Sequence, residues 1–480
     1  MRKFDVVILG SHVGGIMAGA LLTKKGFSVL MLEEKVKARS ARGKYRFRRF
    51  SNLSELVVSR TLVEGVYGLL DLRVERGEFS ARRDLGCQVL LPGHRVDISP
   101  HRANLLEEIR REFPRDFEFI ETLYARVEGK DWLGPILMTL GDEPPFIGQI
   151  RRWFAHEYRA LCDKRVSTIL TSHGGDRAFN RFIDVQMKSM SYILVDDPPF
   201  ALASHLLGIL LKDEAYTDMV NSRGFMDRIK GEMARGGGRI KALDSFGTIR
   251  VEKSGGEFRV YTNGERNPFL SRVFLGDIPF ARLRGLFPKA FSGRGWLERA
   301  ERLWPEYFIF SLHLGVDGGG LPVGLGDCFM SLRDLNGPDA NGNLLMVFVG
   351  PEGVDAPPGK RSVTANAFVP VTNGKTGTTG TEGVAGAILS HLSEVAPFLD
   401  RSIRVIYDQP SQERYQSEWN NGDIIYGTTS SFRVGDAILP TVTPMEGLFL
   451  ACRENFPYLG FEGEILSGMR AAQAVWNRFR

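Results

Sequence analysis

The stretch Val6-Val7-Ile8-Leu9-Gly10-Ser11-His12-Val13-Gly14-Gly15 is the most informative part of this sequence. Its leading apolar residues, most of them β-branched, predict a short strand buried on both faces. Residues 16–25 then read as a helix that Gly26 closes. Residues 28–32 predict a second buried strand, which ends on Glu33. Because the helix fills the crossover, we expect the two strands to be parallel, as in a βαβ unit.

The turn of this βαβ unit carries much of the dinucleotide-binding fingerprint. That fingerprint has glycines at the positions of Gly10, His12 and Gly15, and an acidic residue where Glu33 stands. The first glycine allows the tight turn, and the third lets helix and strand pack closely. The helix N-terminus offers free N–H groups and a partial positive charge to a pyrophosphate. The acidic residue would accept hydrogen bonds from ribose hydroxyls, which disfavours a 2′-phosphate. The unit therefore predicts a site for the ADP half of a dinucleotide.

His12 is the departure from this fingerprint. A glycine at the middle position lets the pyrophosphate approach the backbone, and a histidine adds a side chain there. That side chain could turn away, hydrogen-bond a phosphate, or block the site. A βαβ unit that holds no nucleotide is therefore the alternative interpretation.

Length, composition and charge set broad limits. At 480 residues the chain is long enough for about three domain-sized cores, or for two interleaved ones. Hydrophobic residues make up 43% and charged residues 25%, which is typical of a soluble globular protein. The net charge of +5 is modest, so no nucleic acid is expected as a partner.

Metal and disulfide chemistry find no support in the sequence. The four cysteines form no CxxC pair and are far apart, at Cys87, Cys162, Cys328 and Cys452. A disulfide framework or a zinc site is therefore not expected, and a reducing cytoplasm fits best. The eight histidines show no HExxH spacing, so no metal site is predicted.

Three segments bear on membrane contact. The basic start followed by apolar residues mimics a signal peptide, but Asp5 and the glycine pair at 14–15 interrupt it. Residues 198–211 are apolar yet shorter than the ~18 residues that a membrane span needs. They suit a buried helix, the wall of an apolar cavity, or an interfacial segment. The basic run 35–50 reads as a solvated loop and edge strand, with anion or membrane-surface contact as the alternative. We expect a cytoplasmic protein, with peripheral membrane contact as an option.

The rest of the chain divides by pattern. From about 100 to 220, apolar residues recur at helical spacing. Residues 222–277 read as a helix followed by several short strands, and residues 305–440 are rich in strand patterns. Near the end, a buried strand at 448–451 runs into a loop and then a helix that opens near Glu464. This is a second helix N-terminus that could face an electron-rich group.

The two ends of the chain resemble the phytoene desaturase and carotenoid isomerase branch of the flavin amine-oxidase superfamily. That family's first turn has the form GxGxGG, which residues 10–15 match except at His12. Its C-terminal stretch has the form GLYLAG, then P-x-x-G-x-x-G-x-x-x-SG-x-x-AA. This chain matches that form at residues 447–451, Pro457, Gly460, Gly463, Ser467, Gly468, Ala471 and Ala472. The resemblance is specific at the two ends and only topological across 90–220 and 300–410.

The resemblance implies an α/β fold with a discontinuous FAD-binding Rossmann-like domain, made of a parallel sheet and the βαβ unit. This domain would take residues 1–90, 221–290 and 441–480. An interleaved α+β substrate or partner domain, with a helical lid, would take residues 91–220 and 291–440.

The resemblance also implies an FAD-dependent oxidoreductase that acts on an apolar isoprenoid, polyene or lipid substrate. The flavin N5 would accept a hydride, and the last helix would stabilise negative charge at N1–C2=O. The cofactor contacts that it implies are Gly10, Ser11, His12, Gly14, Gly15, Glu33, Arg42, Phe246, Cys452, Arg453, Gly460, Gly463, Glu464 and Ile465. No catalytic side chain, electron acceptor or oligomeric state is assigned, and His313 is interpreted as structural.

Departures from the family crowd the phosphate-facing region, at His12, Ser40-Ala41 and Cys452-Arg453. Each adds bulk where the family's backbone touches cofactor, although Arg42 and Arg453 could offset phosphate charge. Cys452 is expected to be a buried, inert thiol rather than a covalent flavin link. The alternative function is therefore a flavin-free, non-catalytic relative that binds a lipid or protein partner, as the Rab GDP-dissociation inhibitors of this superfamily do. A small-amine oxidase is a weaker third option, because no clear aromatic pair flanks the C-terminal loop.

Overall fold

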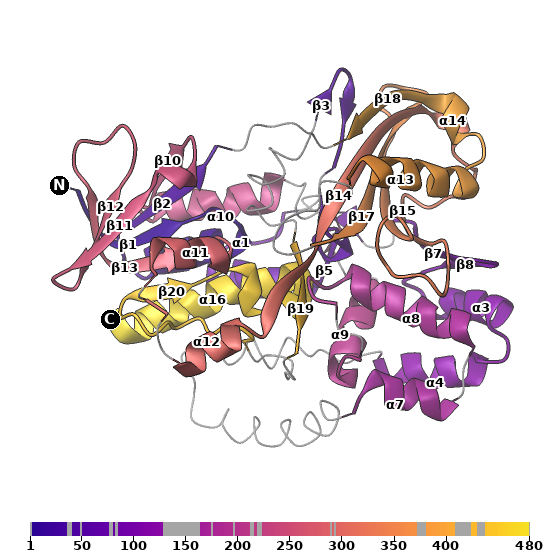
Figure 1. Cartoon of the computed structure of the whole chain (residues 1–480), viewed down its shortest axis with the longest axis horizontal. Coiled ribbons are helices and arrows are strands. Elements are labelled where there is room, and N and C mark those ends of the chain that lie inside the picture. The colour runs from indigo at the N-terminus through magenta and orange to yellow at the C-terminus, as the bar shows by residue number, and fades with distance from the viewer. Residues whose placement is uncertain are drawn as a thin grey trace.

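A computed structural model describes residues 2–35, 41–48, 50–75, 80–81, 85–127, 164–173, 176–194, 197–211, 216–217, 223–288, 290–291, 294–371, 381–408, 424–429 and 437–479. Within these ranges the chain forms two large β-sheets, and helices pack against each of them (Figure 1). Both termini lie at the end of the molecule that holds the first sheet (Figure 1).

The first sheet is built on the predicted βαβ unit, which is confirmed. Strands β1 (Arg2–Leu9) and β2 (Val29–Glu34) pair in parallel, and helix α1 (Val13–Lys24) fills the crossover. Strand β13 (Phe269–Gly276) pairs in parallel with the other edge of β1. The strand order is β10, β2, β1, β13, β12, β11, with β20 beside β13. The remaining bounds are β10 (Arg239–Leu243), β11 (Arg250–Ser254), β12 (Glu257–Tyr261) and β20 (Leu448–Leu450).

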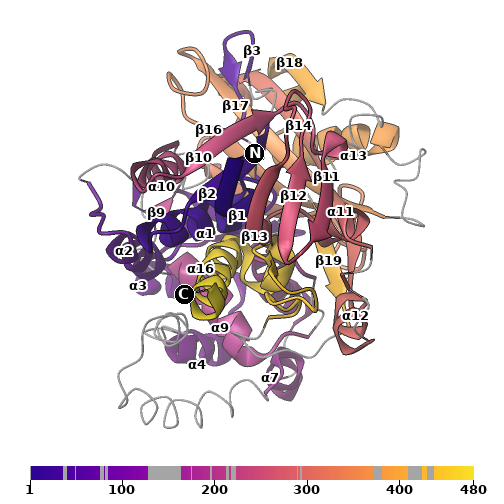
Figure 2. The same ribbon diagram turned by 90° about the vertical axis from the view of Figure 1, so that its left-hand side faces the viewer.

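Three helices pack together against this sheet, namely α1, α10 (Arg223–Arg235) and α16 (Gly460–Phe479) (Figure 2). Helix α1 starts earlier than the sequence indicates, because the extended backbone of His12 (φ −72°, ψ 178°) makes that residue the N-cap. Helix α16 also starts earlier than the predicted Glu464. The N–H of Phe461 donates to the Ser54 hydroxyl at 2.9 Å, which satisfies a donor in the first turn at that earlier start.

The second sheet has the strand order β18, β14, β17, β16, β15, β7, β8, and β19 pairs with β14. Its long central strand, β14 (Leu303–Asp317), runs antiparallel to β17 (Lys360–Pro370) over the whole of its second half. The other bounds are β7 (Cys87–Leu91), β8 (His94–Asp97), β15 (Cys328–Leu332), β16 (Leu344–Gly350), β18 (Ile403–Asp408) and β19 (Ile424–Thr428).

Helices accompany the second sheet on both sides (Figure 1). One side carries α13 (Thr381–Val395) and the short α14 (Leu399–Ser402). The lower helical group contains α3 (Arg102–Glu112), α4 (Phe117–Val127), α7 (Val166–His173), α8 (Arg177–Ser189) and α9 (Phe200–Leu211). Smaller elements are α2 (Arg60–Leu69), α11 (Phe280–Leu286), α12 (Arg294–Ala300), β3 (Ala41–Arg42), β4 (Tyr45–Arg46), β5 (Val57–Val58), β6 (Ser80–Ala81) and β9 (Tyr216–Thr217).

The mixed α/β fold predicted from the sequence is confirmed. The first sheet combines segments from the start, the middle and the end of the chain, and the second sheet uses segments between them. The exact domain boundaries stay a prediction. Within the described residues, no helix combines the length and apolar character that crossing a membrane requires.

The apolar segment at 198–211 forms α9, which belongs to the protein core. Its residues from Phe200 to Leu210 are all buried. The helix packs against α4, α8, β5 and the 3-10 turn η7 (Pro457–Leu459). Of the three interpretations of this segment, the structure therefore supports the buried helix.

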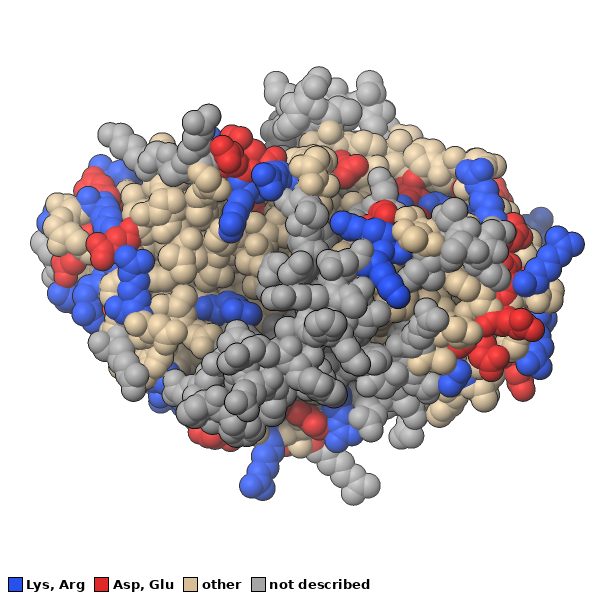
Figure 3. Space-filling view, turned by 90° about the horizontal axis from the view of Figure 1, so that it is seen from below, with Lys and Arg blue, Asp and Glu red and all other residues tan. Residues whose placement is uncertain are grey.

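The basic run at 35–50 is partly structural. Tyr45 and Phe47 are buried, and between them Arg46 is exposed, as in a strand with one wet face. The ring of Phe47 stacks on His313 with centroids 5.0 Å apart, and Arg48 pairs with the carboxylate of Asp355 at 2.8 Å. His313 also bonds the Thr364 hydroxyl, so its surroundings are those of a structural residue. On the face that Figure 3 shows, basic and acidic side chains are interspersed.

Replacing Leu206 in α9 with alanine should destabilise the fold. The side chain is 2% exposed, so its removal leaves a cavity in the core, and we expect a loss of about 2–5 kcal/mol in the free energy of unfolding. Urea denaturation of the variant would measure the loss. Leu69→Ala is the matched control, because Leu69 is 42% exposed. Equal stability of the two variants would contradict a core position for α9.

Candidate cofactor site at two helix N-termini

The glycine turn holds three backbone segments in contact. Gly10 has φ +113°, a conformation that favours glycine, and a Cβ there would lie 2.0 Å from the carbonyl oxygen of Asp277. A Cβ on Gly14 would lie 2.0 Å from the carbonyl oxygen of Ala451, just after β20. The N-terminus of α1 is therefore bounded by the residues that follow β13 and β20.

Asp277 faces the start of α1. The backbone N–H groups of Gly15 and His12 hydrogen-bond its carboxyl group, whereas Oδ2 is buried without a hydrogen-bond partner. Burial raises the pKa of Asp277 well above its usual range, the charge of Glu464 raises it further, and the two N–H groups oppose this. The helix end predicted to bind a pyrophosphate thus meets a carboxyl group of the chain itself.

The predicted cofactor contacts Glu33 and Phe246 also have partners inside the chain. Glu33 lies at the end of β2, as predicted, and its Oε1 pairs with Nζ of Lys230 from α10 at 2.6 Å. The backbone N–H of Phe246 donates to Oε1 of Glu34 at 3.1 Å. The acceptor expected to bind a ribose is therefore engaged, and the backbone N–H of Phe246, a predicted cofactor contact, is held by Glu34.

Arg453 occupies the space before α16. Its Nε lies 2.7 Å from Oε1 of Glu464, in the first turns of that helix, and its Nη2 lies 3.5 Å from Oε1 of Glu55. The guanidinium carbon sits 3.6 Å from the ring centroid of Tyr192, whose hydroxyl donates to Glu55 at 2.8 Å. Burial raises the pKa of Glu55, and Arg453 opposes that rise. This cluster joins two sequence-predicted site residues to two that the sequence reasoning missed.

A second acidic residue of α16 points to another helix. Glu462 is fully buried, and its Oε2 lies 2.8 Å from Nε2 of His205 in α9. Its Oε1 accepts the backbone N–H of Ser59 at 2.7 Å. The first turn of α16 therefore carries a carboxyl group, that of Glu462, which suits the positive end of the helix dipole.

Cys452 is buried, as expected. Its side chain is 2% exposed, its Sγ lies 3.6 Å from Oδ1 of Asn455, and burial raises the pKa of the thiol well above its usual value. Glu454 contributes to that rise and accepts the backbone N–H of Phe280 at 2.9 Å. A thiol held protonated in this way is a poor nucleophile.

Some of the other predicted contacts lie within the described residues, and some do not. Gly460 and Gly463 lie where backbone segments touch, since a Cβ would meet Ser54 at 2.2 Å or the carbonyl oxygen of Phe456 at 2.0 Å. Ile465 is fully buried, and Ser11 lies in the turn. Ser40 lies outside the described residues, as do the side chains of Ala41 and Arg42, so the predicted role of Arg42 stays a prediction.

The residues that the sequence reasoning missed are Asp277, Glu55, Glu462 and Tyr192. A signal existed for two of them. Asp277 directly follows the apolar run 273–276 at the end of β13, and Glu462 interrupts an apolar, glycine-rich stretch. Glu55 and Tyr192 have no such signal, because only the tertiary fold brings them to Arg453.

Comparison with known proteins supports the fold. No protein-family model matches the chain, and no curated protein matches it in sequence. Solved structures match over nearly their whole length. An oxidoreductase from Methanosarcina mazei has 13% identity and a TM-score of 0.61, with 98% of this chain and 100% of that chain covered.

Two further structures are similar. Putrescine oxidase bound to putrescine has 15% identity, 99% coverage of both chains and a TM-score of 0.59. Putative protoporphyrinogen oxidase from Exiguobacterium has 13% identity and a TM-score of 0.55, with 99% of this chain and 98% of that chain covered. At this level of identity the likeness establishes the fold, which is that of amine oxidases and related oxidoreductases. The phytoene desaturase branch stays a prediction.

The side chains at the two helix ends do not fit FAD as they lie. A pyrophosphate needs the N–H groups at the start of α1, which face the Asp277 carboxyl group. It would also add negative charge beside buried carboxyl groups of Glu55, Glu454 and Glu464. Among the described residues around these helix ends, the guanidinium of Arg453 is held by Glu464 and the imidazole of His205 by Glu462. FAD could enter only if Asp277 and the Arg453–Glu464 pair moved.

Removing the guanidinium of Arg453 should be costly. Arg453→Ala leaves Glu464 and Glu55 buried without their cation, so we expect a loss of about 3–5 kcal/mol in the free energy of unfolding. Chemical denaturation would measure it. The control Arg404→Ala breaks an exposed pair with Asp317 and should change stability little. A similarly small effect for Arg453→Ala would show that the network is not a stabilising unit.

Asp277 should make the protein less stable as pH rises. Because its pKa is higher in the folded chain than in the unfolded chain, its contribution to stability is complete below the unfolded pKa and is lost as pH rises through the folded pKa. Asp277→Asn removes this dependence, so its free energy of unfolding should fall less than that of the wild type from about pH 4 to about pH 8.

Urea denaturation across that range would measure the difference in slope. Asp5→Asn is the control of opposite sign. Burial raises the pKa of Asp5, but hydrogen bonds from Ser28 and the Arg272 pair outweigh this and lower it. Its stabilising contribution is therefore lost towards low pH. Parallel pH profiles for Asp277→Asn and the wild type would contradict the assignment.

Proposed function

We propose that this chain is a flavin-free, non-catalytic relative of the oxidases that share its fold, and that it binds a lipid or protein partner. One observation carries the proposal: carboxyl groups of the chain lie at both helix N-termini that would meet the cofactor. Asp277 lies at α1, and Glu462 and Glu464 lie in the first turns of α16.

Electrostatic magnitudes favour this proposal. A helix N-terminus stabilises a nearby anion by about 0.3–1 kcal/mol, and by up to ~2 kcal/mol in a partly buried position. Two unit charges of like sign about 5 Å apart repel by roughly 3 kcal/mol at an effective dielectric constant near 20. Repulsion between a pyrophosphate and a carboxylate such as that of Glu464 would therefore exceed what the helix end supplies. Asp277, whose pKa is raised, would instead compete with the pyrophosphate for the N–H groups of His12 and Gly15. The acidic cluster makes a flavin site costly unless it is rearranged or protonated.

Flavin content tests the proposal directly. We expect the purified protein, produced with riboflavin in the medium, to lack flavin absorbance and to release no flavin on denaturation. Added FAD should leave its own fluorescence unchanged when the protein is titrated in. A known flavoprotein carried through the same purification is the control for cofactor loss. Stoichiometric flavin in the protein, or saturable uptake of FAD, would overturn the proposal.

A second candidate is an FAD-dependent oxidoreductase that acts on an apolar isoprenoid, polyene or lipid substrate. The match to oxidoreductase structures over nearly the whole chain favours it, as does the position of Glu33 at the end of β2. It would require Asp277 and the Arg453–Glu464 pair to move away from the positions described above. Bound flavin together with substrate-dependent bleaching of its absorbance would establish this function in place of the first.

A further inference from the structure

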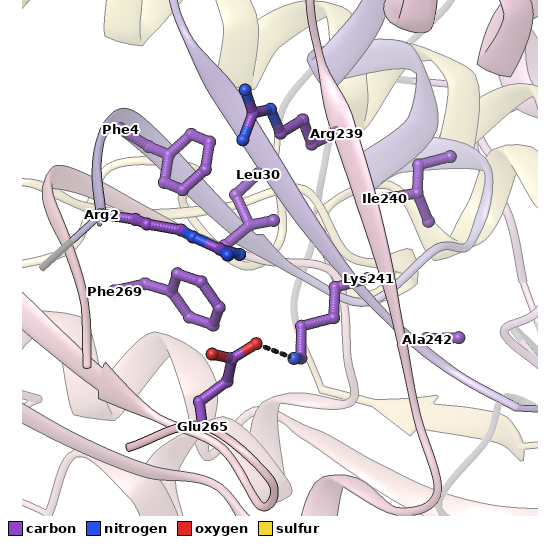
Figure 4. Close-up of a pocket in the computed structure, with 9 residues that line it drawn as sticks. All are labelled: Arg2, Phe4, Leu30, Arg239, Ile240, Lys241, Ala242, Glu265 and Phe269. Atoms are coloured by element: carbon purple, nitrogen blue, oxygen red, sulfur yellow. Dashed lines mark hydrogen bonds and ion pairs between the residues drawn. The ribbon is translucent and has the colours of Figure 1, made fainter. Parts of the chain in front are cut away.

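A cleft of about 380 Å³ opens at the edge of the first sheet opposite to the glycine turn (Figure 4). It lies where the parallel strands begin, since Arg2 and Phe4 come from the start of β1 and Phe269 from the start of β13. The start of β10, the outermost strand, forms its other wall. This volume falls within the usual range for small-molecule sites and is too small for a dinucleotide.

The floor of the cleft is apolar and aromatic. Phe4 and Phe269 are 7% and 3% exposed, and their rings meet edge to face with centroids 6.1 Å apart. Leu30 from β2 is buried beside them, and Ile240 from β10 is 38% exposed. An apolar ring or a short hydrocarbon body would cover the exposed part of Ile240 and the small exposed parts of Phe4 and Phe269.

The rim of the cleft is cationic. The guanidinium of Arg239 lies 6.0 Å from the ring centroid of Phe4, and Nζ of Lys241 lies 5.6 Å from that of Phe269. Lys241 pairs with Glu265, which is the carboxylate of this rim, while Arg2 reaches into the cleft in Figure 4. Within the described part of the chain, neither Arg2 nor Arg239 forms an ion pair. The lining of the cleft therefore carries three cationic side chains and one carboxylate.

We propose that this cleft binds a small organic anion in which a carboxylate is attached to a flat apolar ring. The ring would lie on the Phe4 and Phe269 floor, and the carboxylate would meet the guanidinium of Arg239, whose paired N–H donors match carboxylate geometry. Arg2 supplies further positive charge at the same cleft. The site is independent of the flavin question, because it lies at the opposite edge of the sheet.

Calorimetric titration with 2-naphthoate tests this site. We expect saturable binding to the wild-type protein that weakens as salt is added, and no measurable binding of the neutral isostere 2-naphthylmethanol. Arg239→Ala should weaken 2-naphthoate binding about tenfold, equivalent to ~1.4 kcal/mol. Arg250→Ala is the matched control, because Arg250 is also an exposed arginine that lies over an aromatic ring, 4.3 Å from the centroid of Tyr261, outside the cleft.

A substitution that should strengthen binding distinguishes a loss of the site from a general loss of folding. Glu265→Gln removes the carboxylate of the rim and frees Lys241, so 2-naphthoate should bind more tightly than to the wild type. Absence of binding to the wild type, equal affinity for the alcohol, or an unchanged affinity in Arg239→Ala would overturn the proposal. Bound flavin in the wild-type protein would overturn the proposed function but would not affect the proposal for this cleft.

Discussion

The fold depends on a backbone contact between the two ends of the chain. A Cβ on Gly14 would collide with the carbonyl oxygen of Ala451, and a Cβ on Gly468 would lie 2.2 Å from the carbonyl oxygen of Gly14. Only glycine lets α1, the end of β20 and α16 approach so closely. This contact brings Arg453 and Glu464 to the glycine turn. The candidate site exists because the segment that follows β1 and the segments around β20 and α16 meet there.

The two helix N-termini of this fold can face either a negatively charged ligand or carboxyl groups of the chain itself. In a dinucleotide site, two helix N-termini stabilise negative charge that a ligand supplies. Here carboxyl groups of the chain lie at those helix ends instead: Asp277, whose pKa is raised, at α1, and Glu462 and Glu464 at α16. Arg453 then becomes the buried cation that a carboxylate cluster requires. The fold alone therefore does not tell which molecule, if any, binds at these two helix N-termini.

Local pattern predicted the local parts of this structure. The strand and helix periods and Gly26 were sufficient for the βαβ unit, and glycines near the C-terminus indicated a second helix N-terminus. Partners that are distant in sequence could not be predicted. Lys230 reaches Glu33 from another helix, and the Asp277 side chain meets the turn only because β13 pairs with β1. The departures at His12 and Arg453 led to the hypothesis of an altered pocket, but no local pattern indicated that carboxyl groups lie at both helix ends.

The contact between N-terminal and C-terminal segments also means that the first sheet cannot be completed until the C-terminal segments have been synthesised. Strand β1 leaves the ribosome well before β13, its neighbour in the sheet, and β20 and α16 follow later still. Such non-local pairing folds slowly, because chain entropy is lost before the contacts form. During synthesis, two apolar surfaces stay uncovered until the later segments have been made. They are the strand Val6–Leu9 and the face of α1 that α16 covers. Apolar surface and strand edges that are exposed in this way make a partly synthesised chain prone to aggregation.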